Sequence, residues 1–166
     1  MNAAFDVYLA MSNALRDDLE AILRSEDLSQ SYRRNFIRAS SSLIEGYAHC
    51  FRAICDIGLV TGPGDLTTDE VAALRDEHSL GAKDRTKFTL RAVYKMLKLP
   101  GPPDFSDRGW VQARTFLEKR DAVMHPKSMR NLELPDGEWN EVKDGAIWLF
   151  GQLFGVMEQL AVTHGA

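Results

Sequence analysis

The residues best suited to chemistry lie in one short stretch, Lys119-Arg120-Asp121-Ala122-Val123-Met124-His125-Pro126-Lys127. Asp121 and His125 are four positions apart, so on a helix they share one face. Pro126 disfavours helical geometry at the residue before it, which predicts that the helix ends or kinks at His125. The stretch therefore predicts an arginine, a carboxylate and an imidazole gathered at one helix end.

These residue types could cleave RNA without a metal ion. The 2′-hydroxyl of RNA attacks the adjacent phosphate, which requires a base, an acid for the leaving 5′-oxygen and fixed positive charge. His125 suits the proton transfers, because imidazole gains and loses a proton near neutral pH. Arg120 stays charged and can bind two phosphate oxygens in a fork. Asp121 could orient either the arginine or the imidazole.

Positive charge is concentrated around this stretch. Positions 108–130 carry six Lys and Arg residues against two acidic ones, although the chain has a net charge of -4 and a pI of about 5.6. That balance excludes a broadly basic nucleic-acid coat and allows a local phosphate site. A structural alternative remains, since Lys and Arg are favourable near a helix C-terminus and Asp121 with His125 could be a surface pair. The candidate phosphate-binding residues are Lys119, Lys127, Arg114 and Arg34.

Arg34 belongs to a second basic cluster, formed with Arg33 and Arg38 in the first half of the longest expected helix. Such a cluster is usually a solvated face of a helix. The alternatives are a ridge that contacts phosphate or the edge of a dimer.

The order Arg120, Asp121, three further residues and His125 resembles the R-x4-H motif of the HEPN superfamily, in which a polar residue typically follows the arginine. HEPN domains are all-helical, commonly dimeric, and many are metal-independent endoribonucleases. The resemblance implies that Arg120 and His125 are the catalytic pair and that Asp121 is their polar companion, in place of the commoner asparagine. It covers the bundle in outline from about Ser31 to Met157, and is residue-specific only in the motif.

The resemblance also implies partners. One histidine per chain leaves one proton transfer unfilled, and a homodimer with two facing motifs would supply the second. The predicted function is a metal-independent endoribonuclease without a cofactor, acting on RNA as a toxin or phage-defence effector. A separate antitoxin, such as a nucleotidyltransferase, is a possible partner. Two alternatives stay open: a non-catalytic HEPN-like module that binds nucleotide, RNA or a protein, and a helical regulator whose motif is only a helix end.

The 166 residues predict one domain spanning residues 1–166, with room for a buried core. A hydrophobic content of 45% and a charged content of 27% are ordinary for a globular protein. With no basic-then-apolar leader and no run of about 20 apolar residues, we expect a cytoplasmic protein without a membrane contact. Cys50 and Cys55 are expected to be reduced core thiols, and no histidine has zinc-ligand spacing, so no metal site is predicted.

Apolar residues recur at intervals of three and four along most of the chain, and no alternating strand pattern is present. The pattern predicts an all-α, up-and-down helical bundle of five or six helices. In the helix that ends at the motif, Trp110, Ala113, Leu117 and Met124 are expected to face the core. His49 is expected to be half-buried, His78 to lie in a loop and His164 in a frayed tail. The expected helices are Asn2–Ser25, Leu28–Thr61, Thr67–Asp76, Thr86–Leu99, a helix capped by Ser106 or Asp107, and Trp139–Val162.

Overall fold

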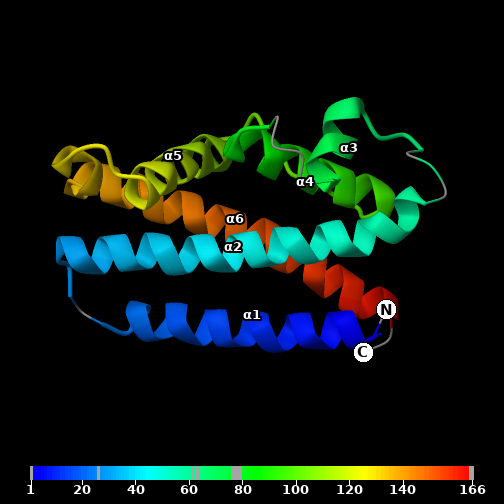
Figure 1. Cartoon of the computed structure of the whole chain (residues 1–166), viewed down its shortest axis with the longest axis horizontal. Helices are drawn as coiled ribbons and strands as arrows, with labels where there is room; N and C mark the ends of the chain where they lie inside the picture. The colour runs from blue at the N-terminus through cyan, green and yellow to red at the C-terminus, as the bar shows by residue number, and fades with distance from the viewer. Residues whose placement is uncertain (1, 26, 61, 63, 76–79, 165–166) are drawn as a thin grey trace. The chain divides into compact units, whose positions relative to one another are not determined.

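The computed structural model describes residues 2–25, 27–60, 62, 64–75 and 80–164. Over these residues the chain forms six α-helices, one short 3-10 helix and no β-strand (Figure 1). The all-helical fold and the predicted number of helices are therefore confirmed. The elements are α1 (Asn2–Leu23), α2 (Gln30–Leu59), α3 (Thr68–Leu74), α4 (Ala82–Met96), α5 (Arg108–Met124), η1 (Met129–Leu132) and α6 (Asp136–His164). None of these helices is long and apolar enough to cross a bilayer.

Local signals set several helix ends. At α3 the Thr67 hydroxyl accepts from the Glu70 N–H while the Glu70 carboxylate accepts from the Thr67 N–H, and together these two bonds form a capping box. α4 begins four residues earlier than expected, because Gly81 adopts an extended conformation and serves as the N-cap. α6 begins at Asp136 instead of Trp139, and its first turn carries acidic residues that favour a helix N-terminus.

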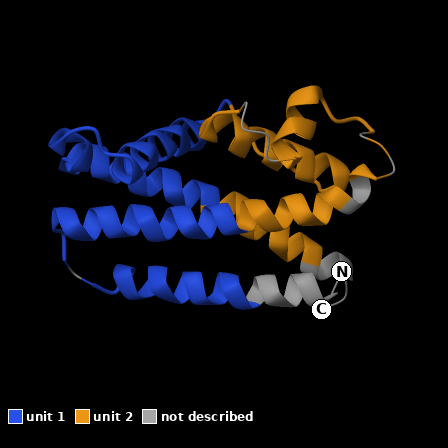
Figure 2. Ribbon diagram, in the orientation of Figure 1, with its two compact units in different colours: residues 1–46, 106–149 blue, residues 47–105, 150–166 orange. Residues whose placement is uncertain are grey.

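The chain divides into two compact units (Figure 2). Unit 1 comprises residues 1–46 and 106–149, and unit 2 comprises residues 47–105 and 150–166. The long helices α2 and α6 each contribute one part to either unit. The single domain predicted for residues 1–166 stays a prediction, and each unit is described by itself.

In unit 1, glycines allow α5 and α6 to approach closely. A Cβ atom added at Gly145 would lie 2.1 Å from the backbone oxygen of Gln112, and one added at Gly109 would lie 1.9 Å from the Trp148 side chain. Both distances are far below van der Waals contact. At Gly145 the two helices touch through their backbones, and at Gly109 the α5 backbone lies against the Trp148 side chain, so a larger residue at either position would force a shift. This contact fixes the position of α5, which carries the motif.

Unit 2 holds the two cysteines. Cys50 and Cys55 on α2 are free and buried, as predicted, and burial raises the pKa of each thiol to about 12. The short helix α3 packs against α4. The carboxylate of Glu70, which is 2% exposed, lies 2.7 Å from the Lys95 ammonium and ties these two helices together.

Two burial predictions are wrong. Met124 is 43% exposed, because the neighbouring Val123 takes the core position and successive helix residues point about 100° apart. His49 is exposed, because Tyr47 and Cys50 occupy the core face of that part of α2. His164 is the last residue of α6. The prediction for His78 lies outside the described residues.

Candidate functional site

The helix that carries the motif is capped at both ends. At its start the Asp107 carboxylate accepts a hydrogen bond of 2.7 Å from the Trp110 N–H, one of the two caps that the sequence allowed. At its end His125 leaves helical geometry with φ -127° and ψ 62°, while its N–H still donates to the Asp121 carbonyl at 3.0 Å. The predicted helix end at the residue before Pro126 is confirmed.

Two carboxylates hold the guanidinium of Arg120. One Nη donates to Asp121 Oδ1 at 2.7 Å, and the other is ion-paired with Glu45 Oε1 on α2. The Arg120 side chain is 22% exposed, whereas those of Glu45 and Asp121 are 59% and 52% exposed. The guanidinium is thus fixed at the surface of unit 1 by acidic groups that themselves face solvent. Through Glu45, α2 contributes one carboxylate to this group beside the motif.

His125 is exposed and stands apart from this ion-pair group. The Asp121 carboxylate contacts Arg120, and no hydrogen bond or ion pair of the His125 imidazole is recorded with the described residues. The structure therefore brings Arg120 and Asp121 together, but joins His125 to them only through the last turn of α5. Arg120 and His125 are five residues apart, a rise of about 7.5 Å along a helix.

The segment after the motif is ordered by one amide. The Asn131 Oδ1 accepts from the N–H groups of Lys127 and Ser128, both at 3.0 Å. The Lys127 side chain is exposed, as is that of Arg130. Asn131 thus fixes the backbone at Lys127, two positions after His125.

The arginine cluster on α2 has an architectural task in unit 1. Arg33 is 7% exposed, donates to the Leu134 carbonyl at 2.5 Å and lies 2.5 Å from the Asp136 carboxylate. Arg34 donates to the Leu132 carbonyl at 3.0 Å. The interpretation of this cluster as a solvated face is therefore wrong for Arg33, because its buried side chain donates to the Leu134 carbonyl in the loop that leads into α6. Arg34 also donates to a backbone carbonyl of this region, although its side chain is only partly buried.

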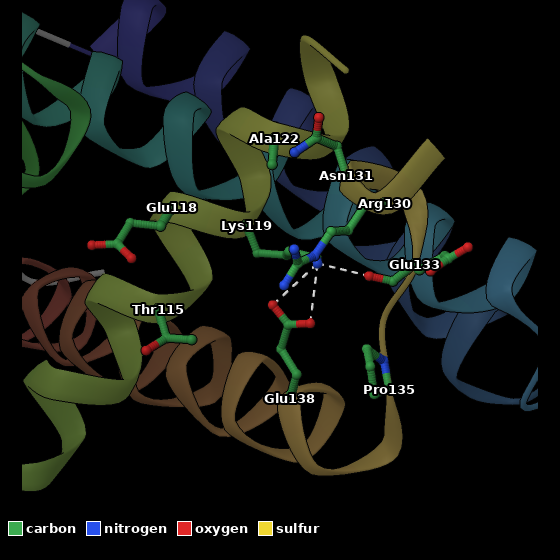
Figure 3. Close-up of a pocket in the computed structure, with 9 residues that line it drawn as sticks. All are labelled: Thr115, Glu118, Lys119, Ala122, Arg130, Asn131, Glu133, Pro135 and Glu138. Atoms are coloured by element: carbon green, nitrogen blue, oxygen red, sulfur yellow. Dashed lines mark hydrogen bonds and ion pairs between the residues drawn. The ribbon is translucent and has the colours of Figure 1, made fainter. Parts of the chain in front are cut away.

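Lys119 is also engaged inside unit 1. Its side chain is 10% exposed, and its ammonium lies 2.7 Å from the Glu133 carbonyl oxygen and 3.1 Å from the Glu138 carboxylate (Figure 3). A phosphate could reach this ammonium only by entering the adjoining pocket. The pocket has a volume of about 410 Å³ and is lined by Thr115, Glu118, Lys119, Ala122, Arg130, Asn131, Glu133, Pro135 and Glu138.

Apart from Asp121, which is half exposed and ion-paired with Arg120, the predicted site residues fall into two groups. His125, Lys127 and Arg114 are exposed, and their side chains are accessible to a ligand. Arg120, Lys119 and Arg34 are engaged with acidic groups or carbonyl oxygens of unit 1. Glu138 and Glu133 were missed by sequence reasoning, because nothing local links them to Lys119. Within the described part of the chain, no three His, Cys, Asp or Glu side chains are grouped so that they could hold a metal ion.

Comparison with known proteins gives no relative: no family model matches the chain, and neither a curated protein nor a solved structure matches it. The resemblance to HEPN proteins thus rests on the motif itself and its place at the end of α5.

Proposed function

We propose that this protein is a metal-independent endoribonuclease of the HEPN type. The observation that supports it best is the end of α5, where a carboxylate-held arginine is followed, five residues later, by an exposed histidine at the helix terminus. Exposed Lys127 and Arg130 lie two and five positions after this histidine and supply further positive charge for a phosphate backbone.

The proposed chemistry uses two copies of the motif. His125 takes the proton of the 2′-hydroxyl, whose oxygen attacks the adjacent phosphorus. The partner subunit's His125 protonates the 5′-oxygen as its bond to phosphorus breaks. The products are a 2′,3′-cyclic phosphate and a free 5′-hydroxyl, and Arg120 stabilises the negative charge of the pentavalent phosphorane between them. Asp121 keeps the guanidinium in place.

RNA has to compete with acidic groups for Arg120. Ion pairs of exposed carboxylates contribute only about 0 to 1 kcal/mol, and both Glu45 and Asp121 are more than half exposed. A phosphate that offers two oxygens to the guanidinium makes a stronger, charge-assisted contact. Arrival of RNA at the proposed site would therefore turn Glu45 out into solvent.

The same ion pairs favour a second candidate, a non-catalytic module that binds RNA, nucleotide or a protein partner. Two carboxylates cancel the charge of a single arginine, and in this alternative Arg120 only joins α5 to α2. On the enzyme hypothesis the protein is a cytoplasmic homodimer that acts as a toxin or in phage defence. A separate antitoxin, such as a nucleotidyltransferase, would hold it inactive.

Cleavage of RNA in the presence of EDTA separates the two candidates. The wild type is expected to cleave and to leave 2′,3′-cyclic phosphate ends, while His125→Ala and Arg120→Ala lose activity at unchanged helix content. His49→Ala is the matched control, since it removes another exposed histidine of the same chain. Binding without cleavage by the wild type would favour the module and end the enzyme hypothesis.

A further inference from the structure

Unit 2 carries a further concentration of positive charge in this acidic chain. Between Ala82 and Lys98 there are six basic residues and one acidic residue, whereas the whole chain has a net charge of -4. All of these residues belong to α4 or to the two positions after it. The site proposed at the end of α5 uses none of them.

Four of the basic residues repeat at every fourth position. Lys83, Lys87, Arg91 and Lys95 therefore follow one side of α4, with a step of about 6 Å along the helix axis. A row of cations along one side of a helix attracts a polymer with one negative charge per repeat, such as a polynucleotide strand. Lys98 extends this row three positions beyond Lys95, and we call Lys87, Arg91, Lys95 and Lys98 the α4 ridge.

The Phe105 ring contacts the first two cations of the α4 ridge. The Lys87 ammonium is 5.7 Å and the Arg91 guanidinium 5.2 Å from the centre of the Phe105 ring. Both distances are typical of cation–π contacts, which hold a cation in place without neutralising its charge. These two residues thus remain positive for an incoming anion.

A groove opens at the C-terminal end of the α4 ridge. It has a volume of about 610 Å³ and lies within unit 2. The Lys95 ammonium on its wall neutralises the buried Glu70 carboxylate at 2.7 Å, so the charge that remains comes from Arg91 and Lys98. The groove is lined by Thr67, Glu70, Arg91, Tyr94, Lys95, Lys98, Leu99, Pro102 and Pro103.

Lys98 occupies a backbone conformation that normally belongs to glycine. Its φ is 52°, and the N–H groups of Lys98 and Leu99 return to the carbonyls of Lys95 and Tyr94 at 3.2 and 2.9 Å. This is the Schellman end of a helix, in which glycine is the usual residue at the left-handed position. Lys98 thus places a long cationic side chain, which lines the groove, at a backbone position that favours glycine. A strained residue beside a groove indicates that its charge has a function.

We infer that the α4 ridge and its groove bind the phosphate backbone of single-stranded RNA, as a contact surface additional to the proposed cleavage site. The inference rests on the proposed function for its choice of RNA. Charge complementarity supplies the affinity, through the cations Lys87, Arg91 and Lys98 along α4 and at its end. A membrane is disfavoured, because no large exposed hydrophobic residue of the described chain lies between positions 80 and 105.

The test uses an RNA that cannot be cleaved by its own hydroxyl. A fluorescent 2′-O-methyl RNA of about 12 nucleotides, within the usual range of single-strand sites, is titrated with the full chain at several salt concentrations. The ridge variant carries Arg91→Gln and Lys98→Asn, since asparagine tolerates positive φ. The control variant carries Arg16→Gln and Arg24→Gln, which remove two exposed positive charges from α1 and the residue after it and so give the same net charge.

We expect the ridge variant to bind about tenfold more weakly than wild type, and its salt dependence to fall by roughly 0.7 per lost phosphate contact. The control variant should stay within about twofold of wild type. A charge-preserving variant, Arg91→Lys with Lys98→Arg, should bind RNA like the wild type. It shows whether weaker binding of the ridge variant comes from lost charge or from a disturbed fold. Equal affinities of the ridge and control variants would overturn the inference, and so would ridge-dependent binding of phosphatidylserine vesicles without binding of RNA.

Cleavage measured on the same proteins separates this inference from the proposed function. If the wild type binds the probe through the α4 ridge but cleaves no RNA, the inference of RNA binding by the ridge is supported and the proposed nuclease function is wrong. If the wild type cleaves RNA and the ridge variant binds and cleaves RNA like the control variant, the inference about the ridge is wrong and the proposed nuclease function is supported.

Discussion

The guanidinium of Arg120 on α5 is ion-paired with the carboxylate of Glu45 on α2, although 75 residues separate them in sequence. The pair lies in unit 1 at the proposed cleavage site, and the Glu45 side chain is 59% exposed. Glu45 therefore joins two helices and also competes with any phosphate for the guanidinium. Which of these effects is larger can be measured.

The first prediction concerns Glu45→Gln. The exposed ion pair contributes less than about 1 kcal/mol, so the free energy of unfolding should change little. Removing the competing charge should raise the affinity for RNA and lower KM by about threefold, because an attraction of under 1 kcal/mol corresponds to a small factor in binding. Urea denaturation and cleavage kinetics measure the two quantities.

Asp18→Asn is the control for Glu45→Gln, since Asp18 is an exposed carboxylate of unit 1 on α1 and the two variants have the same net charge. It should leave KM unchanged. A loss of cleavage in Glu45→Gln at normal stability would contradict the competition argument and give Glu45 a part in the chemistry.

The second prediction concerns the close approach of α5 and α6. A Cβ at Gly145 would lie 2.1 Å from the Gln112 carbonyl oxygen, and backbone cannot turn aside as a flexible side chain can. Gly145→Ala should therefore lower the free energy of unfolding by about 1 to 3 kcal/mol, as overpacking does. Chemical denaturation followed by circular dichroism measures the loss.

Gly151→Ala gives the contrast, because the same helix has open space around a Cβ at Gly151. Alanine is the better helix former, so this variant should gain about 0.5 to 1 kcal/mol. If both substitutions shift stability in the same direction, the close approach at Gly145 is not present in solution.

Local signals explain what could be predicted from the sequence. The box of Thr67 and Glu70, the cap at Asp107 and the helix end before Pro126 each depend on residues within about one turn, and all three are present. The all-helical fold followed from apolar spacing for the same reason.

The engaged cations could not be predicted, because their partners are remote in sequence. Arg33 reaches Asp136 across 103 positions, and Lys119 reaches the Glu133 carbonyl across 14. A basic residue looks the same in the sequence whether it faces solvent or satisfies a buried carbonyl. The close approach at Gly145 could not be predicted either, since a glycine inside a helical pattern does not reveal which backbone lies against it.

The third prediction concerns acid. Burial of Glu70 by itself raises the pKa of its carboxyl, but hydrogen bonds from Lys95 and from the Thr67 N–H, together with the Lys95 charge, outweigh burial and leave the pKa below its ordinary value of 4.5. A carboxyl whose pKa is lowered by folding stabilises the fold above its unfolded pKa. This stabilisation is lost as the pH falls through the lowered pKa of the folded state.

Glu70→Gln removes that contribution while keeping the shape of the side chain. At neutral pH the variant should be less stable by about 1 to 3 kcal/mol, because the amide cannot pair with the Lys95 ammonium. The difference from wild type should shrink as the pH falls below about 4.5. Urea titrations at several pH values test this, with the exposed Asp69→Asn as control. A difference that does not depend on pH would mean that ionisation of the Glu70 carboxyl does not contribute to stability.

The last prediction separates stability from binding at Lys98. Its φ of 52° costs a residue with a Cβ roughly 1 kcal/mol relative to glycine, so Lys98→Gly should raise the free energy of unfolding by up to that amount. The same change removes a cation from the α4 ridge and should weaken binding of single-stranded RNA several-fold. Lys87→Gly loses the same side chain inside α4, where glycine is unfavourable, and should be less stable by about 1 kcal/mol. Denaturation midpoints of both variants measure the change in stability, and RNA titrations measure the change in affinity. A Lys98→Gly protein that gains stability and binds RNA as tightly as wild type would show that the strained lysine has no part in RNA binding.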